Sequence, residues 1–190
     1  MSPRTSGLRE ALILAGIHEI NANGVSAFSI RRVADACGVS CAAPYRHFEN
    51  KREFIAAIID YVNDQWAEQQ EEIVNDAGDT LRDKIVAICV GYVRFLMDTP
   101  TYRSILMLKD EEFDNLYHKA RGQMSSRSQR MEAEFFAESG WPEEKIKRKL
   151  HIVRAILFGT VFLIETGEVE FSQQTLDNIR AAVDREFDLP

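Results

Sequence analysis

Residues 29–48, which read SIRRVADACGVSCAAPYRHF, decide the fold. In the first half of this stretch, apolar residues recur at positions i, i+3, i+4 and i+7, the spacing of one buried face of a short helix. Those residues are Ile30, Val33, Ala34 and Cys37. Gly38 interrupts the pattern, and a second short helix is expected from Ser40 to Phe48. Two short helices joined by a tight turn that contains glycine are typical of a helix-turn-helix.

In a helix-turn-helix, the second helix stands out from the body, and its exposed side chains enter the major groove of DNA. Here that helix carries small residues, which permit close approach, and Arg46, which can donate a bidentate pair to guanine. Pro44 lies so near the helix start that it would remove at most one backbone hydrogen bond. The residues expected to face DNA are Ser40, Cys41, Ala42, Ala43, Tyr45, Arg46 and His47. A plain helical hairpin inside a bundle is the alternative for this segment taken alone.

Outside this segment, nearly the whole chain has a helical period, and the sequence shows no alternating strand pattern of useful length. We therefore predict an all-α fold of about nine helices, with a three-helix head at residues 1–50 and a helical body at residues 51–190. Asn50 and Glu53 are expected to form a capping pair that starts the fourth helix. The expected helices cover residues 8–23, 29–37, 40–48, 50–74, 81–98, 102–108, 112–138, 142–166 and a last stretch around 176–187.

Composition narrows the class of protein. The 190 residues are 45% hydrophobic and 28% charged, which fits a chain with a real core. Three cysteines are too few for a secreted disulfide scaffold, and the longest apolar run, Ala155 to Ile164, is too short to span a bilayer. The start of the chain contains no apolar stretch that could serve as a signal peptide, so a cytoplasmic protein is expected.

The charge is unevenly distributed along the chain. Residues 1–53 contain seven Lys/Arg and five Asp/Glu, whereas residues 54–190 contain sixteen and twenty-five. The whole chain has a net charge of −7, so a small basic part precedes a large acidic one. This split indicates a polyanionic partner for the first part only.

At this point the sequence resembles the TetR family of bacterial transcriptional regulators. The resemblance rests on Gly24, FSIRRVA at 28–34, GVS at 38–40, YRHF at 45–48 and Lys51, and it covers most of residues 8–60. Beyond residue 60 the chain matches the family only in length and helical layout. The resemblance implies a three-helix DNA-binding head and a divergent helical body that binds a ligand and dimerises.

The resemblance also assigns roles to single residues. Ser29 stands where the family usually has a threonine that bonds a phosphate, and Tyr45 stands at an aromatic position that touches the DNA backbone, with His47 beside it. Lys51 lies at the start of the fourth helix, where its charge and the helix dipole both favour a phosphate. Arg31 completes the predicted DNA-binding set.

A homodimer is expected, because one short recognition helix contacts too few base pairs, and two-fold dimers read inverted repeats. The helix from Ile152 to Ile164 is apolar nearly all round, which favours a dimer surface; the alternative is a helix buried in the core of the body. The interface candidates are Ile156, Gly159, Phe162, Leu163, Leu176, Ile179 and Val183.

A ligand pocket is expected among flexible and aromatic residues of the body, which suit an apolar or aromatic molecule. Each of these residues has ordinary core packing as its alternative. The candidates are Trp66, Cys89, Tyr92, Phe95, Tyr102, Met107, Phe113, Tyr117 and Met124. The family's usual arrangement, a repressor that the ligand releases from its operator, is what the resemblance implies.

Other classes of function find less support in the residues. The four histidines are scattered, and neither a His-Glu-x-x-His motif nor a glycine-rich phosphate loop is present, so we expect no enzyme and no cofactor. Cys37 and Cys41 lack a second pair of ligands, so no metal site is expected. An enzyme is the main alternative class of function, and a DNA-binding regulator that responds to oxidation of Cys41 is a second alternative.

Overall fold

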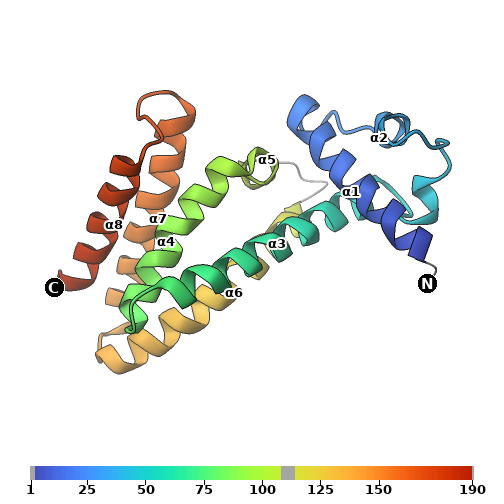
Figure 1. Cartoon of the computed structure of the whole chain (residues 1–190). Coiled ribbons are helices and arrows are strands. Elements are labelled where there is room, and N and C mark those ends of the chain that lie inside the picture. Colours follow the sequence, from blue (N-terminus) through green and yellow to red (C-terminus); the bar gives the residue numbers. More distant parts are fainter. Residues whose placement is uncertain (1–2, 108–113, 190) are drawn as a thin grey trace. The chain divides into compact units, whose positions relative to one another are not determined.

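The computed structural model describes residues 3–107 and 114–189, with side chains described at residues 7–104 and 127–189. Within these residues the fold is all-α, as predicted, and no strand occurs (Figure 1). The elements are α1 (Pro3–Asn23), α2 (Ile30–Ala36), the 3₁₀ helix η1 (Pro44–Arg46), α3 (Lys51–Asp76), α4 (Leu81–Asp98), α5 (Pro100–Met107), α6 (Asp114–Ser139), α7 (Glu143–Glu165) and α8 (Gln173–Asp188). None of the helices described is long and apolar enough to cross a membrane.

Several elements differ from the sequence prediction: α3 ends at Asp76 rather than at residue 74, and α5 begins at Pro100 rather than at residue 102. The first helix begins at Pro3 rather than Leu8, because proline suits the first position of a helix, where the backbone N–H has no partner in the helix. The predicted helix from Ser40 to Phe48 is wrong, since only Pro44–Arg46 is helical there, as a 3₁₀ turn.

The chain divides into two compact units. The first holds the residues up to Gln65 and the segment Thr99–Met124, and the second holds Trp66–Asp98 and the residues from Ser125 onward. Helix α3 therefore supplies residues to both units. The predicted division of the chain into a DNA-binding part and a ligand-binding part, at residues 50 and 51, stays a prediction.

The core of the first unit is built around three phenylalanine rings. Phe48 stacks on Phe54 with ring centroids 4.0 Å apart, and Phe28 meets Phe54 edge to face at 5.3 Å. The hydroxyl of Thr101, in α5, donates to Oδ1 of Asn21 at 2.5 Å and so joins α5 to α1. This packing fixes α1, α2 and the start of α3 as one unit.

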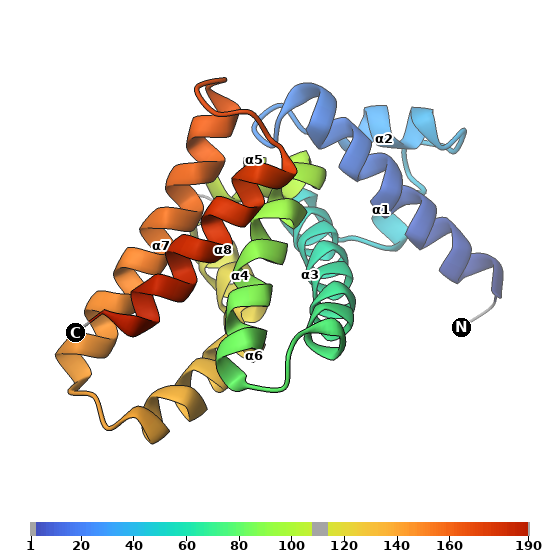
Figure 2. The ribbon, with the colours of Figure 1, turned by 60° about the vertical axis from the view of Figure 1, so that its left-hand side comes forward.

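In the second unit, α4 packs against both α7 and α8, which run side by side (Figure 2). Trp66, in α3, packs against Tyr92 and Phe95 of α4, with ring centroids 5.5 and 5.0 Å apart. Lys149, in α7, is buried and donates from its Nζ to the backbone oxygens of Glu186 (2.7 Å) and Leu189 (2.8 Å). A cation thus satisfies carbonyl groups at the C-terminal end of α8, where the helix dipole also favours it.

Candidate nucleic-acid interface

The turn after α2 depends on a glycine. Helix α2 buries Ile30, Val33 and Ala34, as the sequence spacing predicts. Gly38 follows with φ of +66°, in the left-handed region that residues with a side chain rarely adopt. The N–H of Val39 then donates to the oxygen of Ala34 at 3.0 Å and closes the turn.

The segment from Ser40 to Phe48 is a series of tight turns rather than an α-helix. The N–H groups of Ala43, Arg46 and His47 donate to oxygens three residues earlier, at 2.9–3.1 Å. Pro44 has no N–H, so the first α-helical bond, from residue 44 to the oxygen of Ser40, cannot form. In so short a segment, the loss of that bond favours the tighter 3₁₀ geometry.

Buried residues anchor this segment at two points. Pro44 and Phe48 are buried, whereas Tyr45 and Arg46 between them are exposed. Of the other predicted DNA-binding residues, Arg31, Ser40, Cys41 and Ala42 are exposed, and Ser29, Ala43, His47 and Lys51 are partly exposed. All ten predicted residues lie in the first unit, and a rigid core holds the segment that carries most of them.

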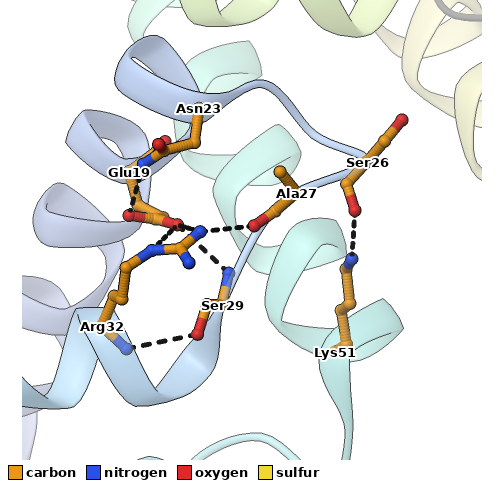
Figure 3. A network of polar contacts seen from close by, with 7 residues as sticks. All are labelled: Glu19, Asn23, Ser26, Ala27, Ser29, Arg32 and Lys51. Carbon is orange, nitrogen blue, oxygen red and sulfur yellow. Dashed lines mark hydrogen bonds and ion pairs between the residues drawn. The ribbon is translucent and has the colours of Figure 1, made fainter.

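A polar network fixes the loop that precedes α2 (Figure 3). Glu19, in α1, accepts hydrogen bonds from Nε of Arg32 (2.8 Å), from Nδ2 of Asn23 (3.0 Å) and from the N–H of Ser29 (3.3 Å). Arg32 also contacts Glu19 through Nη2 and donates to the oxygen of Ala27 at 2.5 Å. The hydrogen bond from Arg32 holds the pKa of Glu19 below its ordinary value, so the carboxylate is ionised at neutral pH.

Two predicted phosphate contacts lie beside this network. The hydroxyl of Ser29 accepts the N–H of Arg32 at 3.4 Å as the N-cap of α2, and its own O–H remains able to donate. Nζ of Lys51 donates to the oxygen of Ser26 at 3.2 Å, which uses one of three ammonium protons. The predicted capping pair is confirmed at the start of α3, where Oδ1 of Asn50 accepts the N–H of Glu53 at 2.9 Å.

The sequence prediction missed Glu19 and Arg32. The signal available in the sequence is that Glu19 adjoins the apolar stripe of α1, next to Ile20. In the structure, only 9% of Glu19 is exposed. An acidic residue that lies in a buried position requires a partner of opposite charge.

The two cysteines of this unit have different surroundings. Cys41 is an exposed free thiol. Cys37 is partly buried against α1, where its thiol donates to the oxygen of Ala11 at 3.6 Å, and burial raises the pKa of the Cys37 thiol. In the part of the chain that the structure describes, no group of three or more His, Cys, Asp or Glu side chains is placed to hold a metal ion.

The predicted pocket residues are only partly brought together. Trp66, Tyr92 and Phe95 are in contact in the second unit, and Cys89 lies buried on the same helix as Tyr92. Tyr102 is buried in the first unit. Met107, Phe113, Tyr117 and Met124 lie outside the residues whose side chains are described.

The predicted dimer residues separate into two groups. On α7, Phe162 is 57% exposed and Leu163 is also exposed, while Ile156 and Gly159 are partly exposed. Phe158, which the prediction did not include, is exposed on the same helix. The chain itself already covers the side chains of Leu176, Ile179 and Val183, so a second copy could not contact them directly.

Comparisons with known proteins agree with this geometry. Residues 12–58 match the family model described as bacterial regulatory proteins, tetR family. The sequence matches none of the curated proteins at a significant level.

Solved structures share the fold at low sequence identity. The transcriptional regulator FadR from Bacillus subtilis, in complex with stearoyl-CoA, is 15% identical, with a TM-score of 0.74 over 93% of this chain and 95% of FadR. A TetR family transcription regulator from Marinobacter aquaeolei VT8 is 18% identical, with a TM-score of 0.71 over 98% of each chain. A TetR/AcrR family regulator from Thermobifida fusca YX-ER1 is 19% identical, with a TM-score of 0.60 over 94% of this chain and 95% of that one.

Proposed function

This chain is a member of the TetR family of bacterial regulators, as the match of residues 12–58 indicates. We propose that it is a homodimeric repressor that responds to a ligand. It binds an inverted-repeat operator through residues 1–50 and releases the operator when a small apolar or aromatic molecule binds the helical body. DNA and this effector are its partners, and the cytoplasm is its place of action.

The anchored segment between Ser40 and Phe48 carries the DNA-binding part of the proposal. Pro44 and Phe48 hold the segment to the core, and Tyr45 and Arg46 project from it. A guanidinium on a rigid support can donate two parallel bonds to guanine, which supports direct reading of sequence. The ammonium of Lys51 and the hydroxyl of Ser29 retain protons for phosphate oxygens, and such contacts set position rather than sequence.

In vitro selection of random duplex DNA at two salt concentrations tests this part. An enriched inverted repeat whose affinity falls with salt is expected. With that repeat as probe, Lys51→Ala should weaken binding to all sequences similarly and lower the salt slope by about 1, whereas Arg46→Ala should relax discrimination at one position by about 1–3 kcal/mol. Arg130→Ala, an exposed cation of the second unit, is the matched control. Unchanged DNA affinity in both Lys51→Ala and Arg46→Ala would refute the proposal.

The exposed aromatic side chains of α7 support the homodimer. Phe158 and Phe162 lie one helical turn apart and are both exposed, and Leu163 adjoins them. A patch of this kind on a small chain is typical of a surface that a partner covers. Sedimentation should show a dimer for the wild type and a monomer for Phe162→Glu, with Ala133→Glu, at an exposed position of α6, as a control that changes the net charge equally. A dimer that withstands Phe162→Glu would place the interface elsewhere.

Helix α3 supports communication between the two predicted sites. It begins at Lys51 and includes Trp66, so one continuous helix carries a predicted phosphate contact and a predicted pocket residue. A ligand that prefers one conformation of the body changes DNA affinity by the ratio of its affinities for the two states. An effector with an apolar part is consistent with the Bacillus subtilis FadR structure, which contains stearoyl-CoA, a molecule with a long apolar acyl chain.

Oxidation of Cys41 is the second candidate for regulation, because this thiol is exposed beside predicted DNA contacts. Alkylation with iodoacetamide should then weaken operator binding by the wild type and leave Cys41→Ser unaffected. Equal operator affinity before and after alkylation of the wild type would remove this candidate.

A further inference from the structure

A cation of α1 lies against the segment that carries most of the predicted DNA contacts. The guanidinium carbon of Arg9 lies 5.4 Å from the centroid of the Phe48 ring. Phe54 stacks on one face of that ring, with the two ring planes 11° apart, so the guanidinium occupies the other face. Arg9 is exposed, whereas Phe48 is only 2% exposed. The cation therefore covers the ring from the solvent side, and its attraction to the ring face holds a long side chain in place.

The ring beneath Arg9 lies at the centre of the predicted DNA-binding surface. Phe48 anchors the end of the recognition segment, two residues after Arg46. Lys51, a predicted phosphate contact, follows Phe48 by three residues at the start of α3. In Figure 1 the N-terminal half of α1 passes beside these turns. All these residues belong to the first unit, so one core fixes the position of Arg9 relative to them.

The guanidinium of Arg9 is free to bind an anion. Within the residues whose side chains are described, it takes part in no hydrogen bond or ion pair. Arg32, by contrast, is already paired with Glu19. A guanidinium has five N–H donors in a planar fork that matches the oxygens of a phosphate. Because the ring of Phe48 positions this fork, less side-chain freedom is lost when an anion binds.

We infer that Arg9 is a further DNA-binding residue, which contacts a phosphate of the DNA backbone beside the recognition segment. This inference rests on the proposed DNA-binding function. Arg9 precedes residues 12–58, which match the family model, and it is not among the ten predicted DNA-binding residues. It lies at the anchored end of the segment rather than at the exposed side chains of Tyr45 and Arg46, which favours the backbone over the base edges. Such a contact adds affinity and orients the unit but reads no sequence.

The salt dependence of binding to a duplex of arbitrary sequence tests the inference in the full chain. Arg9→Met keeps an apolar stem and a sulfur over the ring of Phe48 but removes the charge, whereas Arg9→Lys keeps the charge. Each phosphate contact contributes about 0.9 to the slope of log affinity against log salt, so Arg9→Met should lower the slope by that amount per subunit. Between about 50 and 200 mM salt, the wild type should then lose three- to fourfold more affinity per contact than Arg9→Met. Arg9→Lys and the control Arg130→Met, at an exposed cation of the second unit, should keep the wild-type slope.

A second measurement locates the contacted phosphate. In the inverted repeat selected for the wild type, each phosphate in turn is replaced by an uncharged methylphosphonate. One replacement in each half-site should weaken binding by the wild type and by Arg9→Lys but leave Arg9→Met unaffected, because that variant has already lost the contact. An arginine that only covers the core would produce no such position.

The outcomes separate the role of Arg9 from the proposed function. A wild-type salt slope in Arg9→Met, or a methylphosphonate scan of Arg9→Met identical to that of the wild type, would overturn the inference. Equal losses of affinity in Arg9→Met and Arg9→Lys would also overturn it, since the side chain would then act through its packing on Phe48. A lower slope in Lys51→Ala beside an unchanged slope in Arg9→Met would remove only the role of Arg9. No DNA binding by the wild type would refute the DNA-binding function together with the inference.

Discussion

Removal of the buried ammonium of Lys149 should strongly destabilise the second unit. Lys149 is 1% exposed, and its Nζ donates to two backbone oxygens near the end of α8 and lies 3.2 Å from Oε1 of Glu186. Lys149→Met keeps most of the apolar stem but leaves the carboxylate of Glu186, whose side chain is 10% exposed, without its counter-charge. Removing one partner of a buried ion pair costs about 3–5 kcal/mol, a large share of the roughly 5–15 kcal/mol that stabilises a domain.

Urea unfolding followed by tryptophan fluorescence measures this effect directly. Both tryptophans, Trp66 and Trp141, belong to the second unit, so the signal reports on the unit that is perturbed. The midpoint should fall at an unchanged m-value, because the stability changes and the surface exposed on unfolding does not.

Two variants show whether burial is the cause. Lys147→Met, two residues away on the same helix, removes an exposed ammonium paired with Glu143 at 2.8 Å and should leave the midpoint unchanged. Lys149→Met with Glu186→Gln should recover part of the loss, because the second change removes the uncompensated charge. Equal midpoints for Lys149→Met and Lys147→Met would refute the reasoning.

Two further predictions concern the first unit. The pKa of Glu19 is lowered by the hydrogen bond from Arg32, so Glu19 contributes stability above its ordinary pKa of 4.5, and that contribution is lost as the pH falls through its lowered pKa. Glu19→Gln should therefore unfold at a lower temperature than the wild type at pH 7. Thermal unfolding over a series of pH values should show this difference in unfolding temperature shrinking below pH 4.5. A difference that stays constant with pH would contradict the pairing of Glu19 with Arg32. Gly38→Ala places a side chain at φ of +66° with open space around it, so it should lower the free energy of unfolding by about 1–2 kcal/mol through backbone strain alone. Unfolding followed by circular dichroism measures this loss, which should be smaller for Gly38→Asn. An unchanged free energy of unfolding would show that the turn relaxes.

The helical architecture could be predicted because it depends on local periodicity. Apolar spacing located α2 within one residue at each end, and the pair of Asn50 and Glu53 located the start of α3. The segment from Ser40 to Phe48 could not be predicted in the same way. Pro44 removes only one backbone hydrogen bond, a loss that a long helix tolerates. In a segment of only nine residues, the same loss favours 3₁₀ over α geometry.

Contacts between residues far apart in the sequence could not be predicted from local patterns. Glu19 and Arg32 are thirteen residues apart, and their contact depends on how α1 and α2 cross. The spacing of Leu176, Ile179 and Val183 correctly indicates one buried face of α8, but a helical period does not reveal whether the same chain or a second copy covers that face. The structure shows that the same chain covers these three side chains.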